Sequence, residues 1–260
     1  MKFNTFEKWW LGIFLGLIGI TTIYFSYGAL KVDNSISNII LNVIISPVSA
    51  VTGVLCVVYT AKKHVVSYAF GIVNCITYGY LAYKIGFYGD FMINIFYFLP
   101  FQFIGFKWWK NHHIETDNNI VKSRNFTLKQ LLVVTVVAVF GWVIFTNILA
   151  GVDHFVVNAL KRNASMYDYF TKILKIPYIG EMLDSSTEVF QFIAQFLLSF
   201  GFAEQWIFWI LTNFVSIFMW SLAIYADPTT ASFAIPSLIT WIAFLVNSFY
   251  GLYKWYKKDV

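Results

Sequence analysis

The stretch EQWIFWILTNFVSIFMW, residues 204–220, consists almost entirely of apolar side chains but includes three tryptophans and one asparagine. Trp206, Trp209, Asn213 and Trp220 lie at offsets of 0, 3, 7 and 14 residues, which places them on one stripe of an α-helix. A long apolar helix is typical of a membrane span. Because an amide inside a span is costly unless it is partnered, we expect Asn213 to face the interior of a helix bundle.

The composition of the whole chain indicates a membrane protein. Of its 260 residues, 59% are hydrophobic and only 12% are charged, and the mean hydropathy is +0.67. A soluble domain is usually about 25% charged, so these few charges could not cover an apolar core of this size. The sequence therefore predicts an all-α integral membrane protein whose surroundings are the lipid bilayer. The net charge of +5 requires no nucleic-acid partner, because the basic residues cluster between apolar runs.

Eight stretches qualify, or nearly qualify, as helices that cross roughly 30 Å of hydrocarbon. They are residues 9–30, 36–61, 65–83, 91–109, 127–150, 187–203, 205–226 and 231–253. The first is too long for a signal peptide and lacks a small-x-small cleavage site, so we interpret it as a permanent helix. The predicted domains are an extra N-terminal helix (1–35), a first three-helix repeat (36–109), a connecting region with a lone helix (110–186) and a second three-helix repeat (187–260).

Features between and beside the spans carry further expectations. Residues 110–125, KNHHIETDNNIVKSRN, are expected to form a solvated linker, and the irregular apolar spacing in 151–186 indicates short helices at the membrane surface. The sixth span is expected to begin at the hydroxyl residues 185–187, which precede Glu188 as in a capped helix start. Five tryptophans that flank spans are interpreted as an interfacial aromatic belt. They are Trp9, Trp10, Trp108, Trp109 and Trp255, while Trp206 fits either a belt or a cavity wall.

Positive charge lies mainly on the side of the membrane that holds the N-terminus. With these spans, twelve of the 18 Lys and Arg residues fall on that side and six on the other. Because Lys and Arg favour the cytoplasmic side, both termini are predicted to be cytoplasmic.

The two three-helix groups share a pattern of polar residues. The matching pairs are Asn74 with Asn213, Asn94 with Asn247, and Asp90 with Asp227. The second pair lies in similar tetrapeptides, NIFY (94–97) and NSFY (247–250). An odd number of spans separates the groups, so both run in the same direction and form a parallel repeat about an axis along the membrane normal. Transporters often hold their substrate near the midplane of such repeats.

Polar and tryptophan side chains in the predicted spans are the candidate substrate-binding residues. They are Asn74, Asn94, Gln102, Gln195, Trp206, Trp209, Asn213 and Asn247. Any one amide taken alone is better explained by packing against a neighbouring helix, but the symmetric set favours a shared polar cavity. Uncharged donors and acceptors suit sugar hydroxyls and a carboxamide. Tryptophan faces suit a flat ring, and a cationic ring best of all.

Asp and Glu are missing from the middle of the predicted spans, since Glu188 and Glu204 lie at span ends. A proton-driven carrier usually needs an intramembrane relay, so the sequence favours a facilitator. The four histidines lie in loops or at span ends, and HExxH and HxxxH are missing, so we expect no enzyme activity, no cofactor and no metal site. Cys56 and Cys75 match no metal or redox spacing. A lipid-acting membrane enzyme and a structural protein remain as alternatives.

The stretch W206-x-x-W209-x-x-x-N213 resembles the WxxWxxxN motif of the PnuC family of vitamin-precursor transporters. The resemblance extends from residue 9 to about 256 and includes Gln102 and the basic C-terminus. It implies a core of 3+1+3 helices like that of the SWEET sugar transporters, in which an asparagine pair holds the sugar; Asn94 and Asn247 occupy the matching places.

The resemblance also implies a function. A PnuC-like protein in a bacterial cytoplasmic (inner) membrane would take up nicotinamide riboside by facilitated diffusion, and intracellular phosphorylation would trap the product. Another vitamin, such as thiamine or riboflavin, or a sugar stays an alternative substrate on the same scaffold. The sequence leaves the oligomeric state open, a homo-oligomer included.

Overall fold

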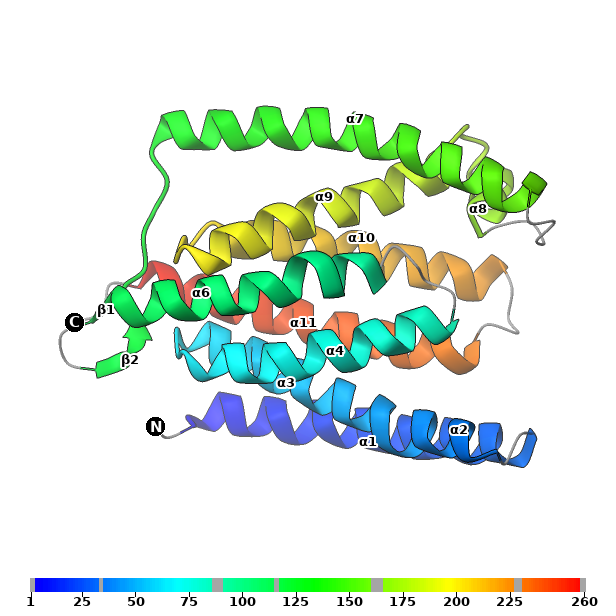
Figure 1. Cartoon of the computed structure of the whole chain (residues 1–260), viewed down its shortest axis with the longest axis horizontal. Helices are drawn as coiled ribbons and strands as arrows, with labels where there is room; N and C mark the ends of the chain where they lie inside the picture. The colour runs from blue at the N-terminus through cyan, green and yellow to red at the C-terminus, as the bar shows by residue number, and fades with distance from the viewer. Residues whose placement is uncertain are drawn as a thin grey trace. The chain divides into compact units, whose positions relative to one another are not determined.

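The computed structural model describes residues 3–32, 35–85, 91–114, 117–159, 166–226 and 231–257. The helices are α1 (Thr5–Val32), α2 (Ile36–Ile39), η1 (Ile40–Ile45), α3 (Ser46–Ala61), α4 (Val66–Ile85), η2 (Ile93–Phe98), α6 (Leu99–Asn111), α7 (Leu128–Ala159), α8 (Met166–Leu174), α9 (Ile179–Ser199), α10 (Gln205–Ala226) and α11 (Ala231–Tyr256) (Figure 1). A short antiparallel hairpin joins β1 (His113–Ile114) to β2 (Asp117–Val121). The expectation of a mainly helical chain is confirmed.

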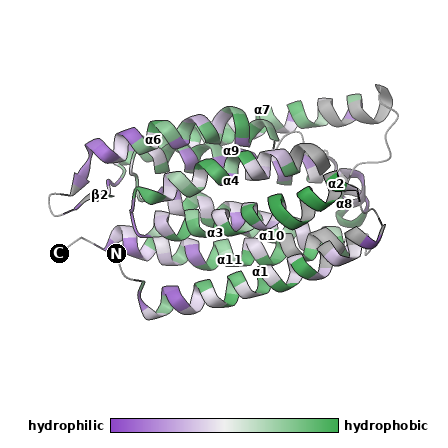
Figure 2. Ribbon diagram, turned by 60° about the horizontal axis from the view of Figure 1, so that its bottom comes forward, coloured by the Kyte–Doolittle hydropathy of each residue, from purple (hydrophilic) through white to green (hydrophobic). Residues whose placement is uncertain are grey.

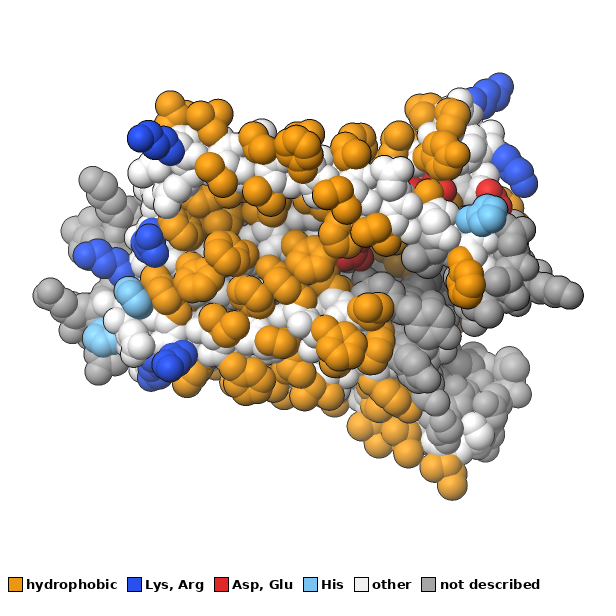
Figure 3. Space-filling view, turned by 45° about the horizontal axis from the view of Figure 1, so that its top comes forward, with side chains coloured by type: hydrophobic (Ala, Val, Ile, Leu, Met, Phe, Trp, Pro, Cys, Tyr) orange, Lys and Arg blue, Asp and Glu red, His pale blue; other side chains and the backbone are white. Residues whose placement is uncertain are grey.

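Among the residues that the structure describes, four helical segments are long and apolar enough to cross a membrane, judged by length and composition alone. They are Thr5–Tyr24, Val43–Ala61, Leu128–Gly151 and Gln205–Ala226. Helices α4, α6, α9 and α11 cover most of the other four predicted spans. Apolar residues run along the helices (Figure 2), and exposed hydrophobic side chains gather along their length while Lys, Arg and His lie toward their ends (Figure 3). So much exposed apolar surface is typical of a protein that contacts lipid.

The helices fall into two compact units by their contacts. Within the described residues, the first unit takes 1–124, 195–203 and 246–260, and the second takes 125–194 and 204–245. Helices α9 and α11 contribute to both units. The first unit therefore contains α1 to α6 and the hairpin, and the second contains α7, α8 and α10.

Aromatic side chains pack tightly at one end of the first unit. Tyr68 meets Trp109 edge-on, with ring centroids 4.9 Å apart, and Trp255 lies 5.7 Å from the same ring. The Nε1 group of Trp109 donates to the carbonyl of Leu198 at 3.0 Å, and that of Trp255 donates to Thr60 at 3.0 Å. Both indoles thus find backbone partners inside the unit, as buried Trp side chains usually do.

This packing corrects the predicted aromatic belt. Trp10, Trp109 and Trp255 are only 4%, 1% and 2% exposed. A belt residue faces the headgroup region of the bilayer, so the belt interpretation is wrong for these three. Trp9, which is 69% exposed, remains a candidate belt residue. Position near a span end does not distinguish a belt tryptophan from a buried one, because the end of a helix has both a face toward the bundle and a face toward the lipid.

Two described segments of wider, π-type winding each end two residues before a proline. Residues 40–45 (η1) precede Pro47 near the start of α3, and residues 93–98 (η2) precede Pro100 near the start of α6. In η2 the N–H of Leu99 donates to the carbonyl of Asn94, a step of five residues. Proline removes one helical donor and crowds the preceding turn, and a π-bulge relieves that crowding.

The connection between α6 and α7 is docked rather than fully solvated. The N–H of Val65 donates to the carbonyl of Asn119 at 2.8 Å, and the N–H of Val121 donates to Lys63 at 2.9 Å. Strand β2 therefore pairs with the turn between α3 and α4, and Val121 is only 1% exposed. The expectation of a solvated linker is wrong for this strand, because its backbone groups and one apolar side chain have partners within the first unit.

A buried ion pair ties the start of α1 to α3 and α11. Glu7 is 2% exposed, and its Oε2 lies 2.5 Å from Nζ of Lys62 at the end of α3. The hydroxyl of Tyr250 donates to Oε1 of Glu7 at 2.7 Å, and Asn4 Nδ2 donates to that hydroxyl at 2.7 Å. The beginning of α1 and the last turns of α11 consequently lie at the same end of the first unit.

In the second unit, the short helix α8 packs on α10. Phe170 is buried with Leu222 and Ala223, and half-buried side chains of α8, α9 and α10 surround them. The hydroxyl of Tyr167 donates to Oδ2 of Asp184 at 2.6 Å, while burial raises the pKa of the Asp184 carboxyl. A short helix in the 151–186 connection was expected, but α7 also continues through residue 159.

Helix α9 begins earlier than predicted. It runs from Ile179, whereas the hydroxyl residues 185–187 were expected to cap its start. Ser185 donates instead to the carbonyl of Glu181 at 2.6 Å, and Ser186 donates to Met182 at 2.7 Å. Back-bonding of this kind is the usual alternative to capping for a hydroxyl inside a helix.

Candidate functional site

The tryptophan–asparagine stripe of helix α10 is largely withdrawn from the surface. Trp206 is 2% exposed, Asn213 is 1% exposed and Trp209 is half-buried. Because Trp206 is buried, it does not belong to an interfacial aromatic belt, which its position near a span end had left as an alternative. The helical spacing thus identified an inward-facing stripe correctly, since all three side chains are at least partly withdrawn from the surface.

The polar face of α10 is wider than the sequence analysis expected. Gln205 and Thr212 are fully buried, and Ser216 is 5% exposed. Thr212 and Ser216 are four residues apart, and Gln205 precedes Thr212 by seven, so the three lie on one helical stripe. The spacing of these residues was the available signal, but the predicted stripe included only amides and tryptophans.

In the first unit, Gln102 lies where α6 meets α4. Gln102 is 5% exposed, and a Cβ added at Gly71 of α4 would collide with its Oε1 atom. Asn94 is also 5% exposed and lies in the π-type segment η2 before α6. Gly71 therefore provides the space in which the Gln102 amide sits.

Two of the predicted site residues bind the backbone of α3. Asn74 Nδ2 donates to the carbonyl of Ser49 at 2.8 Å, and Asn247 Nδ2 donates to the carbonyl of Val57 at 3.0 Å. Gly53 lies between these two acceptors, and a Cβ there would be 2.9 Å from Asn74 Nδ2. For each amide, the sequence left two roles open, packing between helices and substrate binding. The contacts of Asn74 and Asn247 agree with the packing role.

Gln195 belongs to a short chain of polar contacts in the first unit. It is 3% exposed, and its Nε2 group donates to Ser199 Oγ at 3.3 Å. The Ser199 hydroxyl lies 3.4 Å from the carbonyl of Phe101 in α6 and also donates to the Gln195 carbonyl at 2.9 Å. The end of α9 is thereby linked to α6.

The structure divides the predicted site residues between the two units. Asn74, Asn94, Gln102, Gln195 and Asn247 belong to the first unit, and Trp206, Trp209 and Asn213 belong to the second. The shared polar cavity stays a prediction. Asp90 and Asp227, the third predicted pair, lie outside the described residues. Among the residues that the structure describes, no group of three or more His, Cys, Asp or Glu side chains is arranged to hold a metal ion.

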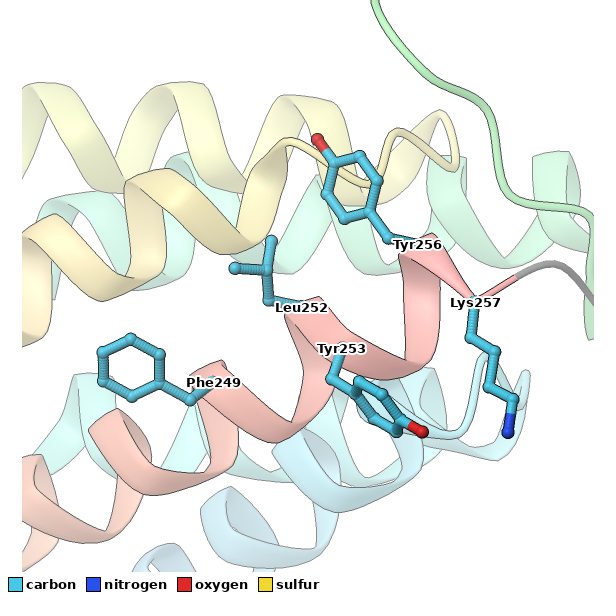
Figure 4. A pocket seen from close by; sticks show the side chains of 5 residues that line it. All are labelled: Phe249, Leu252, Tyr253, Tyr256 and Lys257. Atoms are coloured by element: carbon cyan, nitrogen blue, oxygen red, sulfur yellow. The ribbon is translucent and has the colours of Figure 1, made fainter.

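A groove of about 560 Å³ runs beside the end of α11 (Figure 4). Its lining residues are Phe249, Leu252, Tyr253, Tyr256 and Lys257. The groove contains none of the predicted substrate-binding residues, and its walls are mostly apolar and aromatic. It is therefore a feature separate from the polar side chains described above.

Comparison with known proteins assigns the chain to a family. A family model described as nicotinamide mononucleotide transporter matches residues 43–257. The chain belongs to this family. The match includes all eight predicted site residues, while α1 precedes it.

Individual members of the nicotinamide mononucleotide transporter family align along most of the chain. The nicotinamide riboside transporter PnuC of Neisseria mucosa is 29% identical over 255 residues, which cover 97% of this chain and 81% of that protein. The protein of the same name from Haemophilus influenzae is 29% identical over 211 residues, 81% of this chain and 78% of its own. A crystal structure of the vitamin B3 transporter PnuC matches with a TM-score of 0.69 and 29% identity, covering 98% of this chain and 92% of that one.

Proposed function

We propose that this protein takes up nicotinamide riboside across a bacterial cytoplasmic membrane by facilitated diffusion. The observation that carries the proposal is the alignment of 97% of the chain with a nicotinamide riboside transporter. The buried stripe of Trp206 and Asn213 with the half-buried Trp209 supports it. Nicotinamide riboside has a cationic pyridinium ring, which suits tryptophan faces, and hydroxyl and carboxamide groups, which suit uncharged amides.

The charges of the chain favour the riboside over the mononucleotide that gives the family its description. A mononucleotide carries an additional phosphate, and proteins usually bind phosphate with Arg or Lys. In the predicted spans the only basic residues are Lys107 and Lys129, each two residues from a span end and exposed. A phosphate at the level of the candidate site would therefore be buried without a counter-charge, which is strongly unfavourable.

The roles that we propose for the candidate residues follow from their contacts. Trp206, Trp209 and Asn213 on α10 bind the substrate, and a substrate-binding role for Asn94 and Gln102 of the first unit is a separate hypothesis. The remaining three residues position helices and contribute to binding through that placement. They are Asn74, Gln195 and Asn247.

The proposed membrane arrangement has eight spans, with α1 preceding a SWEET-like core of 3+1+3 helices in two parallel repeats. Both termini are cytoplasmic in this arrangement. The contact of Asn4 with Tyr250 supports placing both ends of the chain on one side. Intracellular phosphorylation would give transport its direction, since no acidic residue lies in the middle of a predicted span to couple an ion.

Uptake into proteoliposomes tests the proposal. Labelled nicotinamide riboside is expected to equilibrate at equal inside and outside concentrations, whether or not a pH step or a sodium gradient is imposed. An enclosed kinase that phosphorylates the riboside should then drive accumulation. Thiamine, riboflavin and nicotinamide mononucleotide serve as competitors and are expected to compete weakly. Accumulation of free riboside under a pH step would overturn facilitated diffusion, and preferred uptake of a competitor would overturn the substrate assignment.

Gly71→Ala is expected to lower affinity for nicotinamide riboside about tenfold with little change in stability. The new Cβ collides with Gln102 Oε1, so the amide must turn away from its present position. The greater helix propensity of alanine, roughly 1 kcal/mol, offsets much of the strain. Binding and melting temperature are measured together. Gly16→Ala, whose Cβ would meet nothing within 4 Å, is the matched control. Unchanged affinity for Gly71→Ala would assign Gln102 to packing alone.

A further inference from the structure

The hydroxyl of Thr212 differs from those of other threonines in the helices. Thr52 and Thr77 donate to the carbonyl four residues earlier in their own helices, at 2.7 and 2.8 Å. This contact is the ordinary way in which a helical threonine satisfies its hydroxyl. Thr212 is fully buried, yet its Oγ1 has no hydrogen-bond partner among the described residues. A hydrogen bond to a bound molecule would satisfy this hydroxyl.

Gln205 shows the same property two helical turns earlier. It is the first residue of α10 and is fully buried, and within the described part of the chain neither Oε1 nor Nε2 has a hydrogen-bond partner. A glutamine amide offers two donors and an acceptor with two lone pairs. Buried polar groups are almost always hydrogen-bonded in native proteins. A pair that lacks partners on one helix face therefore indicates a ligand or bound water at that face.

The spacing places Trp209 between the two unpartnered groups. Trp209 follows Gln205 by four residues and precedes Thr212 by three, so the three side chains share one stripe. Seven residues of helix rise about 10 Å, a length comparable with that of a ribonucleoside. The stripe is adjacent to that of Trp206 and Asn213, which begins one residue later and also includes Trp209. The indole of Trp209 thus has a polar group on each side along the helix.

We propose that Thr212 and Gln205 are substrate-binding residues that hydrogen-bond the polar groups of the nucleoside at either side of the Trp209 ring. The inference rests on the proposed uptake of nicotinamide riboside. It adds two contacts on α10 that are separate from the motif of Trp206, Trp209 and Asn213. The chemical class of the ligand is a neutral or cationic nucleoside, because the hydroxyl and the amide carry no charge and pair with ribose hydroxyls and a carboxamide.

Isosteric substitutions test these contacts by titration of the purified full-length protein with nicotinamide riboside. Thr212→Val removes the hydroxyl and keeps the shape, and Gln205→Met removes the amide and keeps the length. Each variant is expected to weaken binding about tenfold or more, because a polar group of the bound substrate then lacks its partner. The melting temperature of the free protein should stay the same or rise, since the variant no longer buries an unpartnered group. Thr212→Ser, which keeps the hydroxyl, should retain affinity.

Thr52→Val is the matched control, because its hydroxyl bonds only its own helix, and its affinity is expected to equal that of the unmodified protein. If the unmodified protein binds the riboside while Thr212→Val and Gln205→Met bind equally well, the inference is wrong and the two groups are satisfied by water. If the unmodified protein fails to bind the riboside, the proposed function is overturned first. If Gln205→Met does not fold, Thr212→Val and Thr212→Ser decide the outcome.

Discussion

Asn213→Leu is expected to weaken nicotinamide riboside binding about ten- to hundredfold while the protein stays folded. Asn213 is 1% exposed on the inward stripe of α10, and leucine has nearly its size but no hydrogen-bonding group. Loss of a buried hydrogen bond that leaves a substrate group unpaired costs roughly 1–3 kcal/mol of binding free energy. This cost corresponds to a loss of affinity of about ten- to hundredfold. Titration of the purified variant measures the loss, and thermal unfolding verifies the fold.

A matched control separates this loss from a general effect of removing an amide. Asn147 lies exposed on α7 and donates to the carbonyl of Val143 in its own helix at 2.7 Å. Asn147→Leu should leave riboside binding unchanged. If Asn213→Leu folds and binds as the unmodified protein does, Asn213 is a packing residue and the α10 stripe loses its main polar contact.

Lys62→Met is expected to reduce the free energy of unfolding by roughly 3 kcal/mol, the low end of what removal of one partner costs in a buried ion pair. The variant leaves the carboxylate of Glu7 without its cation, although Tyr250 and the backbone of Asn4 still donate to it. Glu7→Gln in the same chain should restore much of the loss. A double-mutant cycle of melting temperatures and unfolding free energies measures the coupling between the two side chains.

Lys8→Met supplies the comparison on the same helix, since Lys8 is exposed and exposed charges contribute little to stability. Its unfolding free energy should change by less than about 1 kcal/mol. If the effects of Lys62→Met and Glu7→Gln simply add, the ion pair does not hold α1 to the first unit. Contacts such as Phe6 with Tyr250, whose rings lie 4.8 Å apart, would then be the main attachment.

Most of the helices could be predicted because apolar runs of membrane length leave the backbone few alternatives to a helix. The details that failed depend on contacts between distant segments. The start of α9 was misplaced because Ser185 satisfies its hydroxyl within the helix, which local sequence does not distinguish from a cap. Strand β2 was missed because its nearby partner, β1, is only two residues long, and its other partner, the turn at Lys63, is distant in sequence. The π-type segments had a visible signal in Pro47 and Pro100.

The candidate site was predictable to the extent that helical periodicity determines it. The inward face of α10 follows from the spacing of Trp206, Trp209 and Asn213, and the burial agrees with it. The partners of Asn74 and Asn247 did not follow from the sequence, because they depend on which helix lies alongside. The lack of a hydrogen-bond partner for Thr212 among the described residues could not be predicted for a related reason, although the spacing places Thr212 on the buried face of α10. Whether a hydroxyl bonds its own helix is a matter of side-chain rotation, which spacing does not reveal.

The attachment of two asparagines to α3 has a consequence for how the sequence can drift during evolution. Both acceptors are main-chain carbonyls, of Ser49 and Val57, and every amino acid supplies the same carbonyl. Mutation at these two positions of α3 can therefore change the side chain without removing the bond, provided that the helix persists. Asn74 and Asn247 have no such freedom, because only their amides supply the donors. Selection on this contact therefore acts on the asparagine alone. In related sequences, substitutions at Asn74 or Asn247 should not be accompanied by compensating substitutions at Ser49 or Val57.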